Sequence, residues 1–332
     1  MPAMNIDIIA PNWLGDAVMS LPALAALREA HPNAALQVYA RRAVAPVYEM
    51  TQLGLRVTLL PEPHSLRVPR ASGDVMAIFP NSFYSALVAA AMRGRRRSGY
   101  ARDRRRWLLH HAVPTPGPNE LRPHESNYYL ELVRRAGLIE RLPESEQPVM
   151  LHPPTASVAR WRERFGGAPL VAMHAGATFG TAKRWLPERF AALAAQCIAR
   201  GWQVAFIGSK GERELAEEVC VRGGGINLAG ETSLTELVAL LAASSALVAN
   251  DSGPMHLAAA VSTPVMALFG STNHRQTYPL AAEGKLRLLR VDGVECSPCK
   301  LRECPIDHRC MTRLEVATVW QALEAMLEKS HD

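Results

Sequence analysis

One stretch constrains the fold of this chain more than any other, residues 246–261, which read ALVANDSGPMHLAAAV. An apolar run at 246–249 ends at the tetrapeptide DSGP, and apolar residues then return at helical spacing. This order predicts a strand, a tight turn and a helix that Ser252 or Gly253 caps. The unpaired N–H groups and the positive dipole end of such a helix suit an anion, and His256 in its first turn can donate to it. An ordinary strand-to-helix turn has the same pattern.

The alternation of strand and helix extends along the whole chain. In the first half, four apolar runs predict strands at 6–10, 36–40, 56–60 and 75–79, with helical or loop stretches between them. After a proline-rich connection at 142–157, strands are predicted at 170–173, 203–207, 246–249 and 265–269. Such alternation is typical of parallel sheets wound with helices. We therefore predict two Rossmann-like, doubly wound α/β domains, which bind ligands at the carboxyl ends of their strands, in a cleft between them.

The length of 332 residues accommodates two domains of ordinary size. The first is expected at 1–150 and the second at 151–313. The last segment, 314–332, is expected to form a helix that packs on either domain, a return to the first domain being one arrangement. The chain has no apolar run of the ~18 residues that a membrane span needs, and its start lacks the pattern of a signal peptide. A cytoplasmic protein is expected.

The first predicted strand leads into a loop that ends at Gly15 and Asp16. Gly15 lets the backbone pass close to a ligand, and a carboxylate at Asp16 stays ionised at the start of a helix. Asp16 is therefore a candidate functional acid, although a simple helix cap would explain it without any function.

Arginine is concentrated in residues 93–106, which contain eight arginines and one acid, Asp103. The formal net charge of +6 is modest for the length, so this uneven distribution says more about partners than the total does. Charge runs are usually solvated surfaces. Eight guanidinium groups this close repel one another, however, which favours an anionic partner.

Two loops of the second half suit a nucleotide diphosphate. Residues 174–185 follow a strand and combine small residues with Thr178, Lys183 and Arg184, although they are not a Walker A motif. Residues 208–212 also follow a strand and end at Glu212, which can accept from a ribose hydroxyl. An acidic first helical turn would explain Glu212 equally well.

Four cysteines lie close together as C-x2-C-x4-C-x5-C: Cys296, Cys299, Cys304 and Cys310. A structural zinc site is one interpretation, because thiolates bind zinc well. The spacings differ from those of paired CxxC knuckles, so a loop of free thiols is the other interpretation. A disulfide framework is not expected in a reducing compartment.

Taken together, four stretches resemble one family across nearly the whole chain. They read NWLGDAVMSLPALAALR, HAGATFGTAKRWLPERFAALA, NDSGPMHLAAAVSTPVMALFGSTN and CSPCKLRECPIDHRCM. The chain resembles the lipopolysaccharide heptosyltransferases of glycosyltransferase family 9. This resemblance implies a GT-B fold and an inverting transfer without a catalytic metal or other cofactor. It also implies ADP-heptose as the donor and the heptosyl-Kdo-lipid A inner core as the acceptor, reached by peripheral contact with the anionic face of the inner membrane.

The resemblance also assigns roles to residues. Asp16 takes the place of the family's general base, Lys183 that of its phosphate-binding lysine, and Glu212 that of its ribose-contacting acid, with Glu214 as a competitor two residues on. The remaining donor contacts are expected at Thr178, Asp251, Ser252, Gly253 and His256. Because the arginine run belongs to the first domain, Arg95, Arg96 and Arg97 are expected to bind the acceptor.

Two other classes of function stay open at this point. Another GT-B nucleotide-sugar enzyme, such as a heptosyltransferase I-like transferase or an epimerase, would share the loops of the second domain. A nucleic-acid-binding protein would explain the arginines and cysteines, but it would leave Asp16 and the diphosphate loops without a role. The arginine run also lacks the interleaved aromatic residues that stack on bases, so no nucleic-acid partner is expected.

Overall fold

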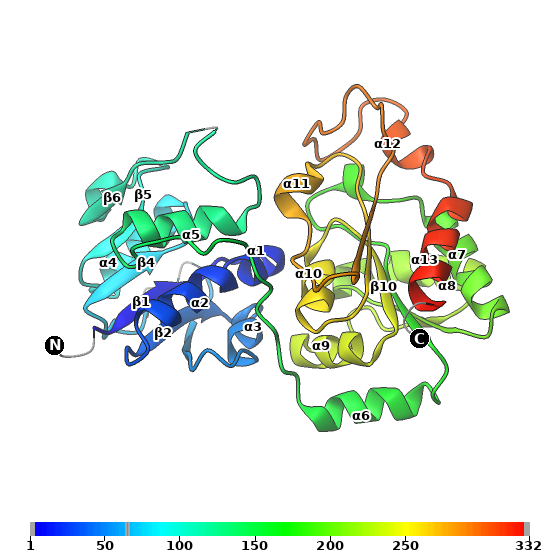
Figure 1. Cartoon of the computed structure of the whole chain (residues 1–332), viewed down its shortest axis with the longest axis horizontal. Helices are drawn as coiled ribbons and strands as arrows, with labels where there is room; N and C mark the ends of the chain where they lie inside the picture. Colours follow the sequence, from blue (N-terminus) through cyan, green and yellow to red (C-terminus); the bar gives the residue numbers. More distant parts are fainter. Residues whose placement is uncertain (1–3, 64, 66, 118, 329–332) are drawn as a thin grey trace. The chain divides into compact units, whose positions relative to one another are not determined.

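The computed structural model describes residues 4–63, 65, 67–117 and 119–328. It divides the chain into two compact units, Met1–His152 and Pro153–Asp332 (Figure 1). Each unit contains one six-stranded parallel sheet with helices on both faces. The predicted α/β class with two doubly wound sheets is therefore confirmed.

The sheet of the first unit has the strand order β3-β2-β1-β4-β5-β6. All of its neighbouring strands are parallel. The two central strands, β1 and β4, are apolar and buried along their length because helices cover both faces. The strands are β1 (Ile6–Ile9), β2 (Leu36–Arg41), β3 (Arg56–Leu60), β4 (Val75–Ile78), β5 (Arg97–Tyr100) and β6 (His111–Val113).

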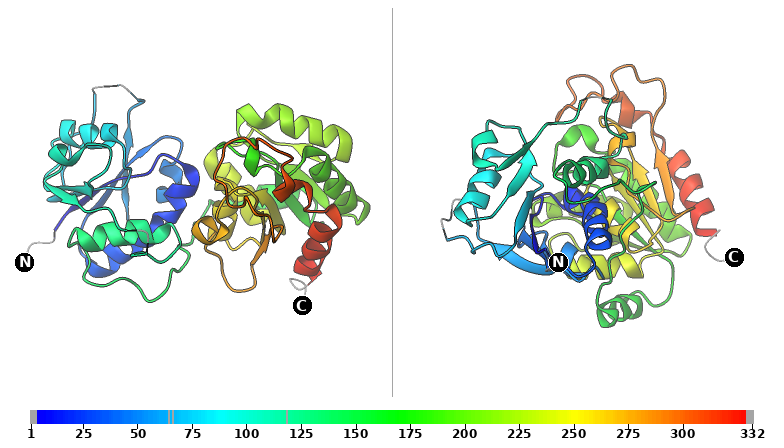
Figure 2. Two further views of the ribbon diagram at one scale, coloured as in Figure 1. Left: turned by 90° about the horizontal axis from the view of Figure 1, so that it is seen from above. Right: turned by 60° about the vertical axis from the view of Figure 1, so that its left-hand side comes forward.

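Helices α2 (Leu21–Ala30) and α5 (Ser126–Arg135) pack against each other on one face of this sheet, and α4 (Phe83–Ala91) packs on β4 at the other face (Figure 2). Helix α3 (Ala45–Glu49) follows β2. The single helix predicted from Asp16 onward is instead two, α1 (Leu14–Met19) and α2, which meet at Ser20. The reason is Pro22, which has no N–H to continue the hydrogen-bond ladder of α1.

The sheet of the second unit has the order β12-β11-β10-β7-β8-β9, again with every pair parallel. Its strands are β7 (Leu170–His174), β8 (Gln203–Phe206), β9 (Ile226–Asn227), β10 (Ala246–Asn250), β11 (Val265–Leu268) and β12 (Leu286–Leu289). Its longer helices are α6 (Thr155–Arg164), α7 (Pro187–Ala199), α8 (Arg213–Gly223), α9 (Leu234–Ala243), α10 (Gly253–Ala260) and α13 (Val316–Glu328).

Helices α7, α8 and α13 pack together on one face of this second sheet, and α6, α9 and α10 pack together on the other (Figure 1). The C-terminal helix α13 lies on α7 and buries Val319 and Leu323 in the core of the second unit. Residues 329–332 of the predicted C-terminal segment lie outside the described residues. Within the described residues, no helix has the length and apolar character needed to cross a membrane.

Both sheets reverse their strand order at a central pair, β1 and β4 in the first unit and β7 and β10 in the second. Doubly wound sheets bind ligands at this point, at the carboxyl ends of the strands, because the loops diverge there and leave room. The loop before Asp16 follows β1. The loops that contain Lys183 and Asp251 follow β7 and β10. The fold therefore brings the predicted acid and the predicted diphosphate loops to the two switch points.

Candidate active site

Lys183 and Asp251 come from the two loops at the switch point of the second sheet. Lys183 ends the short helix η2 (Thr181–Lys183), and its Nζ lies 2.8 Å from the Oδ2 of Asp251. The hydroxyl of Thr272, which follows β11, donates to the same oxygen at 2.6 Å. Because Asp251 is buried and Lys183 is mostly buried, water screens this pair only weakly. The ammonium group is therefore held in one place.

A second chain of polar contacts runs from Glu212 to the start of α10. The Oε1 of Glu212 lies 3.4 Å from the Nε2 of His174, and the Nδ1 of His174 lies 2.9 Å from the hydroxyl of Ser252. That hydroxyl also donates to the carbonyl of Asn250. These contacts connect the loop after β8 with the loop after β10 through the buried His174 at the end of β7.

Glu212 has the environment of a permanently ionised acid. Burial by itself would raise the pKa of this carboxyl group, but the hydrogen bond and charge of His174 and two hydrogen bonds from Ser209 together lower it to about 2. The Ser209 N–H and hydroxyl both donate to the Oε2 at 2.8 Å. Ser209 and Glu212 thus form a capping box at the start of this short helix. The Oε1 is buried and contacts the Nε2 of His174 at 3.4 Å. Glu214 belongs to the first turn of α8 and takes no part in these contacts.

The loop after β7 is fitted closely to Glu212. A Cβ at Gly176 would lie 1.9 Å from the Glu212 Oε1, so only glycine leaves room for the carboxylate. The buried side chain of Asn250 fixes this loop, because its amide donates to the carbonyls of Ala175 and Gly176 and its Oδ1 accepts from the Trp185 N–H. Asn250, His174 and Thr272 were not assigned roles from the sequence, although each one lies in a stretch that carries the resemblance.

The remaining predicted donor residues surround the start of α10. Ser252 is the residue before the helix, but its side chain makes no capping bond, because its hydroxyl contacts His174 instead. Gly253 begins the helix, and His256 is buried in its first turn. Thr178 is exposed in the loop after β7. The predicted donor residues thus come from loops at one edge of one sheet.

Asp16 is the third residue of α1, where the helix dipole favours a carboxylate. The residue before the helix is Trp13, so Asp16 is not the helix cap. Burial, followed in order of effect by the charge of Asp16, raises the pKa of the Tyr129 phenol. Tyr129 lies on α5 and has a buried ring. The acid therefore lies beyond the carboxyl end of the central strand β1, where its charge acts on a buried phenol.

The arginines predicted to bind the acceptor lie at the amino ends of the strands of the first sheet, whereas Asp16 lies beyond the carboxyl end of β1. Arg97 begins β5, and Arg95 and Arg96 precede that strand. Arg95 forms a 3.9 Å ion pair with Asp74, which precedes β4. Arg97 donates to the carbonyls of Leu108 and Gly94. Because the strands are parallel, these residues lie at their amino ends, and the fold does not bring them to Asp16.

The cysteine segment, residues 296–310, contacts the loops that hold Lys183 and Thr272. The Ala182 N–H donates to the Arg302 carbonyl, and a Cβ at Gly180 would lie 2.2 Å from that same oxygen. The Lys300 N–H donates to the Ser271 carbonyl at 2.7 Å. The segment therefore supports the site, a role that its cysteine spacing did not indicate.

The four thiols of this segment are free, and Cys310 is buried. Burial raises the pKa of the Cys310 thiol to about 11, and the charges of Cys304, Cys299 and Cys296 contribute to the shift. Among the residues that the structure describes, no three His, Cys, Asp or Glu side chains form a group that could hold a metal ion. The zinc interpretation of the sequence therefore has no preformed ligand set in this structure.

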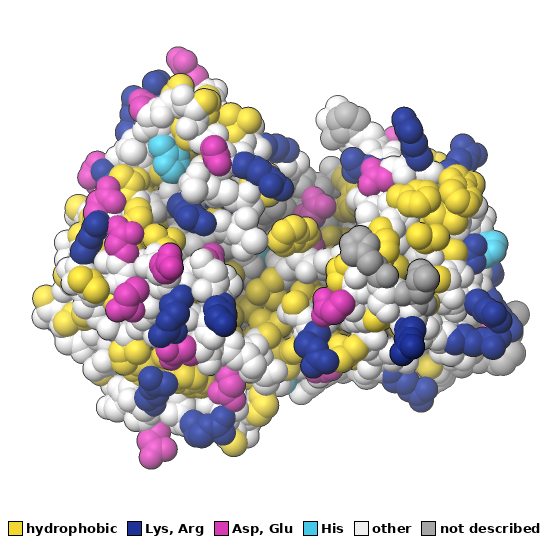
Figure 3. All heavy atoms as spheres, turned by 180° about the vertical axis from the view of Figure 1, so that it is seen from behind, with side chains coloured by type: hydrophobic (Ala, Val, Ile, Leu, Met, Phe, Trp, Pro, Cys, Tyr) yellow, Lys and Arg dark blue, Asp and Glu magenta, His cyan; other side chains and the backbone are white. Residues whose placement is uncertain are grey.

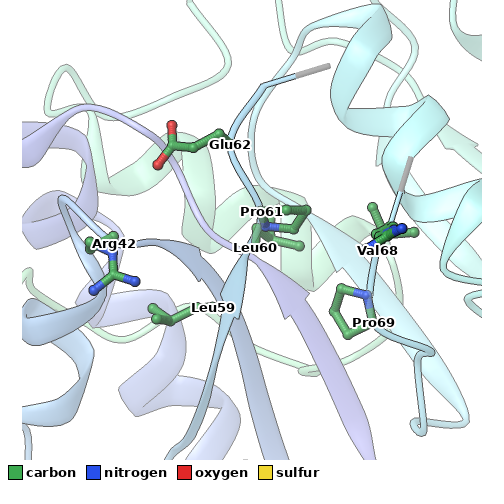
Figure 4. Close-up of a pocket in the computed structure, with 8 residues that line it drawn as sticks. Arg42, Leu59, Leu60, Pro61, Glu62, Val68 and Pro69 are labelled. Carbon is green, nitrogen blue, oxygen red and sulfur yellow. The ribbon is translucent and has the colours of Figure 1, made fainter. Parts of the chain in front are cut away.

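A cavity of about 490 Å³ lies at the carboxyl ends of β2 and β3 in the first unit (Figure 4). Arg42 follows β2 and Glu62 follows β3, and both line it. The loop at its rim includes positions 64 and 66, which lie outside the described residues. The sequence singled out none of the residues that line it.

Two Rossmann-like sheets and a polar network at a switch point are the features expected of a GT-B nucleotide-sugar enzyme. The family model for glycosyltransferase family 9 (heptosyltransferase) matches residues 67–309. The chain is 31% identical to the lipooligosaccharide heptosyltransferase 2 of Haemophilus influenzae, over 84% of this chain and 86% of that protein. It is also 31% identical to the lipopolysaccharide heptosyltransferase 2 of Escherichia coli, over 87% of this chain and 88% of that protein.

Among solved structures, the ADP-heptose lipopolysaccharide heptosyltransferase II of Escherichia coli superimposes with a TM-score of 0.82 and 29% identity, covering 99% of this chain and 100% of that one. The chain belongs to glycosyltransferase family 9. It is therefore a glycosyltransferase, as the resemblance predicted.

Proposed function

We propose that this chain is an inverting heptosyltransferase of type II, which transfers heptose from ADP-heptose to the heptosyl-Kdo-lipid A inner core. The similarity to heptosyltransferases 2 over 84% to 87% of the chain supports this acceptor. The match to a heptosyltransferase 1 covers only 48% of the chain. A heptosyltransferase I-like activity is the second candidate, and it differs in requiring an acceptor without the first heptose.

The observation that carries the proposal is the polar network at the switch point of the second sheet. Glu212, ionised above a pKa of about 2, can accept from a ribose hydroxyl. His174 fixes the distance from Glu212 to Ser252 at the start of α10, where the Gly253 N–H and the positive end of the helix dipole face the diphosphate. This arrangement suits a nucleoside diphosphate that spans the edge of the sheet, with Thr178, Gly253 and His256 as further contacts.

Lys183 stabilises the leaving ADP. When the bond between heptose and the β-phosphate breaks, negative charge builds up on the phosphate oxygens, and a fixed ammonium group lowers the energy of that state. The ion pair with Asp251 occupies one of the three N–H bonds of Lys183 and orients the others. In this proposal Asp251 positions Lys183, since a second anion beside the diphosphate would repel it.

Asp16 acts as the general base. The acceptor hydroxyl loses its proton as it attacks the anomeric carbon from the face opposite the leaving ADP, which inverts that centre. A carboxylate within hydrogen-bond reach contributes about 10²–10⁴-fold to such a step. The position of Asp16 in the first turn of α1 keeps it ionised for this role.

The test is a transfer assay with two acceptors, the Kdo-lipid A core with one heptose and the same core without it. Purified protein and ADP-heptose should release ADP and add one heptose to the first acceptor only, and Asp16→Asn should abolish both signals. Transfer only to the core without heptose would favour the heptosyltransferase I-like candidate. ADP-heptose consumed without any acceptor would indicate a hydrolase or an epimerase and overturn the proposal.

The location and the zinc prediction need their own measurements. We infer that the protein works at the cytoplasmic face of the inner membrane, in peripheral contact with anionic lipid and without a nucleic-acid partner. Cell fractionation in low and high salt tests this location.

Elemental analysis of protein purified without chelator tests the prediction of zinc at Cys296, Cys299, Cys304 and Cys310. Less than about 0.1 zinc per chain would end that prediction, since a structural site is close to fully occupied.

A further inference from the structure

Three large hydrophobic side chains lie on the surface of the first unit where α4 meets the short helix η1 (Arg106–Leu108). They are Phe83, Leu87 and Trp107, which are 39%, 44% and 72% exposed. The rings of Phe83 and Trp107 lie 5.8 Å apart. Phe83 and Leu87 are one helical turn apart and share a face of α4. We call these three residues the aromatic patch.

The backbone beneath the aromatic patch is fixed. Arg105 is fully buried, and its guanidinium donates to the carbonyls of Pro80, Ser82 and Tyr100 and to the hydroxyl of Ser85. Leu108, on the other side of Trp107, is buried in the core of the first unit. Because Arg105 and Leu108 are anchored inward on either side of Arg106 and Trp107, η1 presents the indole of Trp107 to the outside.

Exposed arginines precede Trp107 in the sequence. Arg106 precedes Trp107 on η1, and Arg102 and Arg104 lie in the preceding loop. Asp103 is the one acid among these five positions, 102–106. Figure 3 shows Lys and Arg side chains beside exposed hydrophobic side chains on the first unit. An exposed indole next to arginines is the composition of a surface that binds anionic lipid, because the ring enters the interface and the cations pair with phosphates.

The aromatic patch also lies at the carboxyl ends of the strands of the first sheet, as Asp16 does. Helix α4 begins after β4, and η1 follows β5, so the patch belongs to the carboxyl ends of these strands. The β1 strand leads to Asp16 at the same edge. An acceptor held by its lipid anchor in a membrane would therefore meet Asp16 from the side of the molecule that carries the patch.

We propose that Phe83, Leu87 and Trp107, with Arg102, Arg104 and Arg106, form a docking surface for an anionic lipid bilayer. This inference rests on the proposed function in one respect, namely that the acceptor is anchored in the membrane by its lipid. The aromatic side chains insert at the level of the headgroups, and the arginines bind lipid phosphates. The protein thereby finds an acceptor by diffusion along the membrane rather than from solution.

The experiment measures binding of the full chain to vesicles of phosphatidylethanolamine with 30% phosphatidylglycerol, by flotation at several salt concentrations. Wild type should bind, and the bound fraction should fall as salt rises. Trp107→Ser should reduce the partition coefficient about tenfold, since a buried indole contributes on the order of a large apolar side chain. Trp107→Phe should retain most of the binding. Arg104→Gln with Arg106→Gln should reduce it about fivefold for each charge.

The matched control is Val221→Ser with Arg222→Gln on α8, an exposed hydrophobic residue and an exposed arginine of the second unit. This variant should bind vesicles like wild type. Equal losses in the control and the Trp107→Ser variant, or no binding by wild type, would overturn the proposal. If size-exclusion chromatography showed wild type as a dimer and Trp107→Ser as a monomer, the patch would be an interface between two copies, which would also overturn it.

Transfer to a deacylated, soluble acceptor separates this proposal from the proposed function. Trp107→Ser should leave that reaction within about twofold of wild type, because no membrane takes part. A protein that binds vesicles but transfers no heptose would contradict only the proposed function. A protein that transfers heptose but does not bind vesicles would contradict only the docking surface.

Discussion

The Nζ of Lys183 and the Thr272 hydroxyl both reach the Oδ2 of Asp251, at 2.8 Å and 2.6 Å. This one carboxylate oxygen holds in place a lysine from the loop after β7. The position of the ammonium group therefore depends on residues from three different loops at the edge of the second sheet.

Asp251→Asn should lower kcat by about tenfold or more while changing the Kd for ADP-heptose by less than about fivefold. The lysine keeps its charge but loses the partner that orients it, and small misplacements are costly in a transfer step. Lys183→Ala should instead weaken donor binding and slow transfer together. Calorimetry and initial rates distinguish the two patterns. An unchanged kcat in Asp251→Asn would show that Lys183 does not need Asp251 for its position.

Asp16→Asn should lower turnover by at least about 10²-fold, because an amide cannot accept the proton of the acceptor hydroxyl. The Kd for ADP-heptose should stay within about twofold, since the donor network belongs to the second unit. Single-turnover assays and calorimetry measure the two quantities. Near-normal turnover would remove Asp16 from the chemistry.

Gly176→Ala should raise the Kd for ADP by about tenfold or more. Its new Cβ would lie 1.9 Å from the Glu212 Oε1, so the carboxylate must move away from its position. The matched control is Gly211→Ala, in which the new Cβ would have its nearest neighbour at 3.9 Å, in the loop that also holds Glu212. Equal ADP affinity in the two variants would show that the position of Glu212 is unimportant for the nucleotide.

Glu212 should make the stability of the protein depend on pH at acidic values. Its pKa is lowered to about 2 in the folded protein, and it is near 4.5 when unperturbed, so the unfolded state takes up the proton first as the pH falls. The stabilisation is complete above about pH 4.5 and is lost towards pH 2. The difference in urea midpoint between wild type and Glu212→Gln should therefore shrink between pH 6 and pH 3.5. A constant difference would contradict the lowered pKa.

Replacing Arg95, Arg96 and Arg97 with glutamine should leave the acceptor KM within about twofold. These residues precede or begin β5, at the amino ends of the strands, whereas Asp16 lies at the carboxyl ends. Loss of the Arg97 hydrogen bonds to Leu108 and Gly94 should instead reduce the melting temperature. Kinetics with a soluble acceptor and a thermal melt check both statements. A clear rise in acceptor KM would restore the acceptor role that the sequence indicated.

Sequence patterns predicted the central strands of both sheets because these strands are buried on both faces and read as continuous apolar runs. The edge strands β6, β9 and β12 were missed, since β6 has three residues, β9 has two, and β12 is only partly buried. Strand β5 was missed for a different reason. It lies inside the arginine run, and the density of charge around it concealed the buried residues Ser98, Gly99 and Tyr100.

The roles of Asp16, Lys183 and Glu212 stay predictions of the resemblance, and the structure places Asp16 after β1, Lys183 after β7 and Glu212 after β8. The supporting residues were not predicted, because their roles depend on contacts between distant segments. His174 is one example, since its two partners lie 38 and 78 positions along the chain. Arg105 is another. Nothing in a run of eight arginines distinguishes the one that is buried and binds main-chain carbonyls from those that remain exposed.

The identical strand order of the two sheets has a consequence for how such enzymes diversify. Each half has its own switch point, and the residues assigned to the donor and to the acceptor reaction are divided between the halves. Under the proposed function, mutations that alter sugar-acceptor preference can accumulate in one half without disturbing nucleotide recognition in the other. A lineage can acquire a new glycan specificity by changing loops on one sheet, or by recombining halves from two ancestors, while the inherited donor chemistry persists.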